Sequence, residues 1–509
     1  MASVSDLYAP LRDVELQIPL YSVGIAVLAV IILVAAPSTN ANGGIKAPYI
    51  GSKNRLFTRF QFLNRGWELA YAGHVQFKNQ IYKVIGGDIL VLPTSFVEEL
   101  HNLPDEKISS IKANVKNFQG RLAGASILLE GNLHTRILQT KVTPQLASFI
   151  PRIEDELKLA LKNVIGSCAD GPVELTGYAT VLAHVSRISA RVFVGDSLCR
   201  NQKWIETSLK YVNNALGTMF VLRCFPDTMK PALTWVIPSS WRTSAAIRDA
   251  IKVIGTEVRT RREEQAKNPK AEKPFDFLQF MMDNASEFDG QPHKLAHRQL
   301  ILSLGSIHVT SVSLCQIWFD IVARPEYVPE LREELEMVQK ECGGWNKEAL
   351  GRLRKLDSFM REALSLSPPS ILGFKRIVQQ PVTLSDGTIL PKDADIMVVV
   401  APISKDVATL PNQVPFDGFR HYRTWKEAGG KLNNSFATTS LDNLHFGHGR
   451  YACPGRFLAS DAIKMILGEW MLNYDMEFVG DKSRPVSTPW HEVMFPDLKK
   501  KVRFTKRTS

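Results

Sequence analysis

The chain has 509 residues, of which 45% are hydrophobic and 22% charged, and its formal net charge is +11. These are ordinary globular proportions, and the chain is long enough to bury a large core around a small-molecule cavity. The basic residues are scattered and form no dense cluster, which argues against a nucleic-acid partner. The six cysteines include no C-x-x-C pair, which argues against a disulfide framework or a structural zinc site and favours a reducing compartment.

Residues 18–36 form an uncharged apolar segment. At about 19 residues it has the length that a helix needs to cross the hydrocarbon core of a bilayer. A cleaved signal peptide is the alternative, but its first region should be basic, whereas Asp6, Asp13 and Glu15 outweigh Arg12 before this segment. Because Lys46 and Lys53 follow the segment, we expect a single-pass transmembrane anchor, with residues 1–17 in the lumen and the body in the cytosol.

A short linker, residues 37–47, leads into one continuous body, residues 48–509. Helical periodicity dominates residues 105–365 and a strand-rich stretch covers residues 375–399, so we expect a mainly α fold with a smaller β-rich part. Residues 299–323 are apolar enough to resemble a second membrane span. Their internal histidine and serines would be costly in lipid, so we expect a buried central helix instead.

A glycine-rich loop around Cys453 is the strongest local motif, and it reads FGHGRYACPG from Phe446 to Gly455. Its glycines allow unusual backbone dihedrals and a close approach of the backbone to a flat group. Cys453 stands just before an expected helix, whose positive end and free N–H groups stabilise a thiolate. A thiolate held in this way is a metal ligand. A buried structural cysteine is the alternative.

This loop resembles the heme-binding loop of the cytochrome P450 family, F-x-x-G-x-[R/H]-x-C-x-G, which Phe446, Gly449, Cys453 and Gly455 match. The resemblance implies a cytochrome P450 fold, here preceded by one N-terminal transmembrane helix. It also implies a heme (iron protoporphyrin IX) whose iron, the metal of the site, is bound by the thiolate of Cys453. Tyr451 occupies the position of the usual Arg or His, which meets a heme propionate. A phenol can still donate a hydrogen bond there, without charge assistance.

Two further stretches resemble supporting parts of the family. Glu362 matches the first residue of the E-x-x-R pair, but Ser365 replaces the arginine that would share its helix face. Arg420 resembles the loop arginine that joins the same structural cluster, so we expect it to pair with Glu362. His134 and Arg136 lie in a stretch that resembles the helix supplying another propionate contact, and plain surface or core roles are the alternative.

The expected central helix contains GSIHVTS, which resembles the oxygen-binding stretch [A/G]-G-x-[D/E]-T-T. His308 takes the acid position, and Val309 takes the position of the threonine that helps deliver protons. Thr310 lies one residue on, about 100° around the helix, and cannot take the same place without a local bulge. These three are the candidate catalytic residues, and a satisfied core histidine is the alternative for His308.

The apolar candidates for the substrate pocket, for which a place in the hydrophobic core is the alternative, are Ile307, Ile371, Leu372, Met494 and Phe495. The overall resemblance is to fungal kaurene-oxidase-like and indole-diterpene members. It implies a monooxygenase of secondary metabolite biosynthesis, acting on an apolar small molecule such as a terpenoid or meroterpenoid with O2. Electrons would come from NADPH through NADPH-cytochrome P450 reductase, docked on the basic face near Cys453.

The resemblance places the protein in the endoplasmic reticulum membrane, with residues 48–509 as a cytosolic heme-thiolate catalytic domain. Three departures, at Ser365, Val309 and Tyr451, leave two alternatives open. One is a heme-thiolate isomerase or dehydratase that needs neither O2 nor NADPH. The other is a catalytically impaired heme-binding protein.

Overall fold

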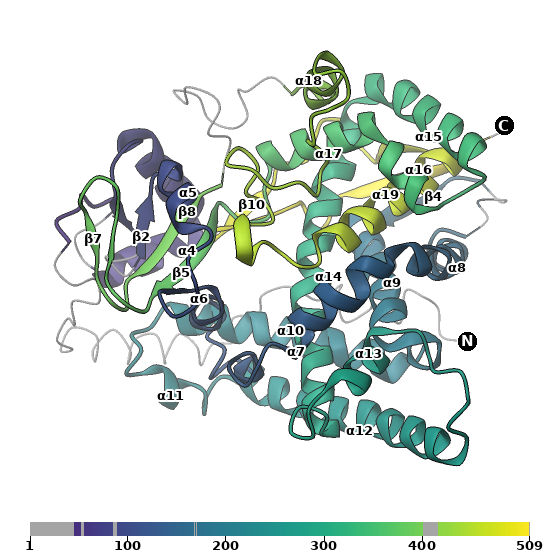
Figure 1. Ribbon diagram of the computed structural model, residues 1–509. Helices are drawn as coiled ribbons and strands as arrows, with labels where there is room; N and C mark the ends of the chain where they lie inside the picture. Colours follow the sequence, from purple (N-terminus) through teal and green to yellow (C-terminus); the bar gives the residue numbers. More distant parts are fainter. Residues whose placement is uncertain are drawn as a thin grey trace.

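The structure is a computed structural model that describes residues 45–51, 55–84, 89–166, 168, 171–400 and 416–507, without the side chains of residues 55–58. The expected lumenal segment, the anchor and most of the linker lie outside the described residues. A large helical part packs against a smaller part built around a sheet. Figure 1 shows that sheet, with β2, β5 and β8, at one end of the molecule.

The helices form one body around a long central helix, α14, which contacts α9, α10, α12, α17 and α19. Its apolar side chains meet those of its neighbours, and Trp318 of α14 lies 4.6 Å from Trp470 between ring centroids. The α-helices are α4 Arg55–Gln76, α5 Val97–Leu100, α6 Ser110–Asn117, α7 Leu133–Ile137, α8 Leu146–Val164, α9 Gly177–Cys199, α10 Gln202–Arg223, α11 Lys230–Leu233, α12 Pro238–Lys267, α13 Phe277–Asn284, α14 Pro292–Ala323, α15 Val328–Cys342, α16 Lys347–Arg352, α17 Arg354–Leu366, α18 Arg420–Glu427 and α19 Arg456–Asn473.

The described strands form four sheets. The largest has the order β1-β2-β8-β5-β3, in which β2 and β8 are parallel and the other pairs antiparallel. A three-stranded sheet has the order β4-β12-β9, and β6-β7 and β10-β11 are two-stranded. The strands are β1 Tyr82–Val84, β2 Ile89–Leu92, β3 Ile108–Ser109, β4 Val173–Thr176, β5 Leu372–Val378, β6 Val382–Thr383, β7 Ile389–Leu390, β8 Asp395–Val399, β9 Tyr474–Phe478, β10 Thr488–Trp490, β11 Val493–Phe495 and β12 Lys501–Lys506.

Strand β5 contains a bulge that matters for the site. Its register against β8 shifts between Gly373 and Arg376, and Phe374 has a φ of +49°. Leu372 consequently packs in a core with α4, whereas Phe374 belongs to a separate core with Leu444 on the approach to the cysteine loop. One strand thus contributes side chains to two cores.

The central helix α14 is the part of the described chain that is long and apolar enough to cross a membrane, and most of it is buried inside the protein. This is the central helix that the sequence predicts. Its middle differs from its ends, because Gly305 is exposed and the side chain of Val309 is 50% exposed, although Leu304 and Ile307 are buried. Residues four apart share one helix face, so α14 presents an accessible apolar face halfway along the core.

Candidate active site

The cysteine loop is closed by its own backbone. The N–H of Cys453 donates to the carbonyl of Phe446 at 2.7 Å, and α19 begins after Gly455. Gly449 has a φ of +71°, and a Cβ at this position would lie 2.4 Å from Cδ2 of His101. Only glycine fits there, because a side chain would meet both backbone strain and the histidine.

The thiol of Cys453 is accessible to solvent from one side, yet it lies deep among protein atoms. This desolvation raises the pKa of Cys453, while hydrogen bonds from the backbone N–H groups of Gly455 and Arg456 and the charge of Arg456 act to lower it. Backbone donors aimed at the sulfur are the arrangement that stabilises a coordinated thiolate. The site therefore has a sulfur donor with an accessible side and preformed hydrogen bonds.

Arg376, on β5, is a site residue that the sequence reasoning missed. Its buried guanidinium lies 5.2 Å from the ring of Tyr451. Nη1 donates to the carbonyl of Lys375 at 2.9 Å and to Oγ of Ser110 at 3.3 Å, but Nε and Nη2 have no hydrogen-bond partner in the described part of the chain. Burial lowers the pKa of Arg376 to about 10. Unpaired buried donors are costly, and a carboxylate such as a heme propionate would satisfy them.

These groups fit a heme. The thiol of Cys453, supported by its backbone donors, suits the iron, and the guanidinium of Arg376 beside Tyr451 suits a propionate. Burial raises the pKa of the Tyr451 phenol, which keeps it a neutral donor. The signal that could have revealed Arg376 is a cation inside the apolar strand LGFKRIV.

His134 and Arg136 are engaged elsewhere. Nδ1 of His134 accepts from Arg298 of α14 at 3.2 Å, and burial together with Arg298 lowers the pKa of His134 to about 4. Arg136 donates to the carbonyl of Asn284, at the end of α13, at 2.9 Å. In this stretch it is Leu138 that lies beside the cysteine loop, 3.6 Å from where a Cβ of Gly455 would be. The polar atoms of His134 and Arg136 thus serve α13 and α14.

The three candidate catalytic residues point in different directions. Nδ1 of His308 lies 2.8 Å from the hydroxyl of Tyr178 on α9, and Nε2 lies 2.9 Å from Oδ1 of Asn213 on α10. Burial lowers the pKa of His308 to about 4, so the ring is neutral near pH 7. Val309 lies on the accessible face of α14, and Thr310 is half-buried. The structure therefore separates His308 from Val309 and ties it to α9 and α10.

The candidate pocket residues divide into two groups. Ile307 is buried in an apolar cluster with residues of α9 and α10. Ile371 and Leu372 are buried in a core with α4, which agrees with the core alternative for these three residues. Met494 and Phe495, on β11, keep partly exposed side chains. Of the five, only these two retain surface on which a ligand could pack.

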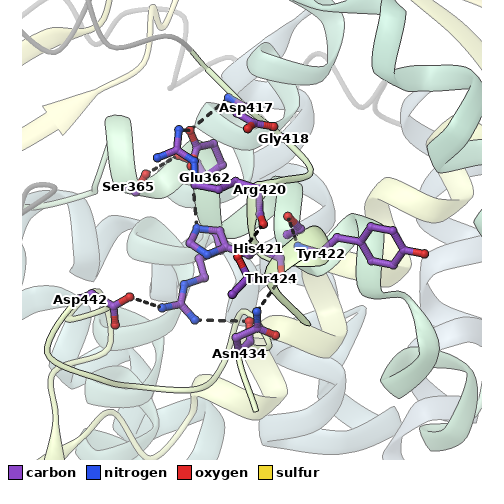
Figure 2. A network of polar contacts seen from close by, with 12 residues as sticks. Glu362, Ser365, Asp417, Gly418, Arg420, His421, Tyr422, Thr424, Asn434 and Asp442 are labelled. Carbon is purple, nitrogen blue, oxygen red and sulfur yellow. Dashed lines mark hydrogen bonds and ion pairs between the residues drawn. The ribbon is translucent and has the colours of Figure 1, made fainter. Parts of the chain in front are cut away.

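The cluster around Glu362 is shown in Figure 2. Oε1 of the buried Glu362 accepts from Nη2 of Arg420 at 2.8 Å and from the backbone N–H of Asp417 at 3.1 Å. Ser365 donates to the backbone carbonyl of Glu362 at 2.8 Å, so its hydroxyl serves its own helix. His421 lies 3.8 Å from Oε2, but burial, Arg361 and Arg420 lower its pKa to about 4 and keep it neutral. Arg420 is therefore a charged partner of Glu362 among the described residues.

Comparison with known protein families identifies this arrangement. The sequence model of the cytochrome P450 family matches residues 89–504, which include α14, Glu362 and the cysteine loop. The chain belongs to the cytochrome P450 family. The match confirms the predicted cytochrome P450 fold, mainly α with a smaller β-rich part, and membership implies a heme cofactor and electrons supplied by a reductase.

The relatives of this P450 support the same family assignment. It is 44% identical to a cytochrome P450 monooxygenase of Emericella nidulans, over 89% of this chain and 86% of the relative. It is 42% identical to the cytochrome P450 monooxygenase olcJ of Penicillium canescens, over 91% and 89%. It is 32% identical to an ent-kaurene oxidase of Gibberella intermedia, over 92% and 90%. The P450 described here is thus a monooxygenase related to enzymes of fungi.

Proposed function

We propose that this P450 oxidises a terpenoid or meroterpenoid in fungal secondary metabolite biosynthesis, using O2 and electrons from NADPH. The observation that carries the proposal is that a protein with the cysteine loop also has an apolar, accessible face on α14 that bears Gly305 and Val309. Such a face suits a hydrocarbon skeleton, and one relative is an ent-kaurene oxidase.

The residues divide the work as follows. Cys453 would hold the iron, and Arg376 and Tyr451 would hold a propionate through the donors described above. When bound, the heme supplies the oxygen chemistry, which a thiolate ligand promotes by electron donation. The protein must then deliver protons without a hydroxyl at position 309.

Ser306 and Thr310 are suited to that task, because residues four apart share one face of α14. The hydroxyl of Ser306 is buried and has no hydrogen-bond partner in the described part of the chain. It can therefore hold a water that reaches the accessible face beside Val309. His308 positions α14 instead, since both of its ring nitrogens are occupied by Tyr178 and Asn213.

The reductase would approach the surface at the cysteine loop. Arg450 is exposed and Arg456 is half-buried, and both are within three residues of Cys453. Positive charge on this face favours an acidic partner surface and would increase the association rate at low salt.

Membrane association would use two elements, the anchor at residues 18–36 and an exposed apolar patch. We call the second the Trp235 patch; Trp235 is 77% and Trp241 57% exposed, with Val236 between them also exposed. It lies over a core that includes Leu233 and Ile237, against which Leu63 of α4 packs. Because α4 follows the anchor in the chain, both elements would face one membrane. Tryptophans favour the membrane interface.

We propose single-pass attachment to the endoplasmic reticulum membrane, with residues 1–17 lumenal, 37–47 as linker and 48–509 as the cytosolic catalytic domain. An apolar substrate would partition into the same membrane and enter from there.

The test uses full-length protein co-expressed with NADPH-cytochrome P450 reductase in microsomes. The reduced carbon-monoxide spectrum should show a thiolate-type Soret band, and a panel of diterpene hydrocarbons and diterpene carboxylic acids should yield oxygenated product only with NADPH. Cys453→Ala should abolish the band and all turnover. Product formed equally without NADPH would instead establish an isomerase or dehydratase, and heme binding without any product from the panel would count against a terpenoid substrate.

A further inference from the structure

A buried charged group lies where four elements meet. Nη1 of Arg223, at the end of α10, donates to Oε2 of Glu492 at 3.0 Å. Nζ of Lys375, on β5, donates to Oε1 of Glu492 at 3.1 Å. Glu492 lies in the turn between β10 and β11, and Asn117 ends α6 and accepts from Arg223 at 2.8 Å. We call Arg223, Lys375, His491 and Glu492 the Glu492 cluster.

The Glu492 cluster carries more positive than negative charge. The side chain of Lys375 is 15% exposed and that of Glu492 is 6% exposed, and two cations share this one carboxylate. His491 adds no balancing charge, because burial and Arg223 lower its pKa to about 4 and leave it neutral. The charge of the nearby Asp395 also acts on Lys375, but Asp395 is paired with Lys116 at 3.2 Å as well, so in the described part of the chain three cations share two carboxylates. A surplus charge removed from water is unfavourable unless an opposite charge meets it.

The hydrogen bonds identify the unused donor. Arg223 directs Nε and Nη2 to Asn117 and Nη1 to Glu492, so each of its nitrogens is engaged. The ammonium of Lys375 has three N–H donors, and its hydrogen bond in the described part of the chain goes to Glu492. His491 is buried with neither ring nitrogen hydrogen-bonded in the same part. Lys375 and His491 therefore offer donors that the described residues leave unmet.

The Glu492 cluster connects the two sides of the proposed active site. On β5, the residue after Lys375 is Arg376, which lies beside Tyr451 of the cysteine loop. On the other side, β11 follows Glu492, and the carbonyl of its Met494 accepts from Gln316 of α14 at 3.3 Å. The partly exposed Met494 thus provides apolar surface between Glu492 and the central helix.

We propose that the Glu492 cluster binds a carboxylate of the substrate through Lys375, so that the substrate is a terpenoid acid rather than a neutral hydrocarbon. This rests on the proposed function. A carboxylate would balance the surplus charge and accept the unused N–H groups of Lys375 in charge-assisted hydrogen bonds. A neutral skeleton would neither balance the charge nor accept charge-assisted hydrogen bonds from Lys375.

The experiment compares a diterpene carboxylic acid with its methyl ester at pH 7.5, titrated against the full-length heme-loaded protein and followed by the substrate-induced shift of the Soret band. The acid should bind at least about tenfold more tightly than the ester, as expected for a buried charge-assisted hydrogen bond. Lys375→Met should remove this preference, and Lys375→Arg should keep much of it. Lys482→Met, a change at an exposed lysine that follows β9 and pairs with Glu477, is the matched control.

Equal binding of acid and ester by the parent protein would overturn the proposal, whatever the variants do. Equal weakening of both ligands in Lys375→Met would overturn it too, because the lysine would then serve only packing. Loss of heme from Lys375→Met alone would assign the ammonium to the heme or to the fold, and also overturn it. The reduced carbon-monoxide spectrum of the parent tests the proposed function separately, because it depends on Cys453 and not on Lys375.

Discussion

The phenol of Tyr178 and the imidazole of His308 form a partly buried hydrogen bond of 2.8 Å that joins α9 to the middle of α14. On the other side of the ring, Oδ1 of Asn213 can only accept, so Nε2 of His308 carries the proton and Nδ1 accepts from Tyr178. The residue that the family pattern would place in proton delivery is therefore fixed as a neutral link among three helices.

Tyr178→Phe should lower stability and leave oxygen chemistry nearly intact. The change keeps the ring but leaves Nδ1 of His308 a buried acceptor without a donor, which costs about 1–3 kcal/mol. Thermal unfolding of the heme-loaded protein measures the loss, and peroxide formed per NADPH measures coupling. Tyr211→Phe, which removes a buried hydroxyl bonded to the carbonyl of Gly124, is the control. A large rise in peroxide without loss of stability would give His308 a role in proton delivery.

Stability should fall as the pH drops from about 6.5 toward 4. Burial lowers the pKa of His184 and His308 from 6.5 to about 4, so the unfolded chain takes up protons in this window before the folded protein does. Their contribution to the stability of the folded protein is complete above pH 6.5. It is lost as the pH falls toward their folded-state pKa of about 4. Melting temperatures between pH 7 and 5 measure the slope, and His308→Gln should reduce it. An unchanged slope in that variant would show that His308 does not contribute to the pH dependence of stability.

Arg420→Ala should impair heme loading and stability. It removes a charged partner of the buried Glu362, and removing one member of a buried ion pair costs about 3 kcal/mol or more. Ser365→Arg should be tolerated or mildly stabilising, because it restores a cation on the same helix face.

Heme content per protein and thermal unfolding are the measurements for both variants. Arg423→Ala is the matched control on α18, since Arg423 pairs with Asp417 at the surface, where such pairs contribute little. If Arg420→Ala were as stable as the control, the ion pair with Glu362 would have no importance for the fold.

The cysteine loop, the central helix and the pairing of Glu362 with Arg420 could be predicted because each depends on local spacing or on a motif. Arg376 could not, because its importance lies in two guanidinium nitrogens that are left without partners by the surrounding packing. The orientation of His308 and the burial of Ile371 depend on which helices pack against them. Sequence periodicity selects a helix face but does not say which neighbour covers it.

Val309→Thr should lower the peroxide released per NADPH. The side chain is half exposed on the accessible face of α14, so an added hydroxyl there can hold a proton-relaying water. The volume hardly changes, so substrate affinity should remain similar. Val322→Thr, near the end of the same helix, is the control. If the parent released little peroxide per NADPH with every substrate and the substitution changed nothing, position 309 would have no role in proton delivery.

Deletion of residues 2–44 should move much of the protein from the membrane to the supernatant while the heme spectrum survives. Residual binding should depend on the Trp235 patch, so Trp235→Ser with Trp241→Ser in the shortened chain should reduce vesicle flotation further. Val486→Ser, at an apolar residue exposed elsewhere, is the control. Loss of heme on truncation would mean that the deleted segment belongs to the fold.

The bulge in β5 makes the spacing of that strand more important than its composition. Side chains alternate along a strand, so removing or adding one residue beside Phe374 would exchange the directions of all residues on one side of the change. Lys375 would then turn away from Glu492, and Arg376 away from Tyr451. Among related chains, β5 should accordingly accept many substitutions of apolar residues but very few insertions or deletions, and its length should be a better marker of shared substrate chemistry than its overall identity.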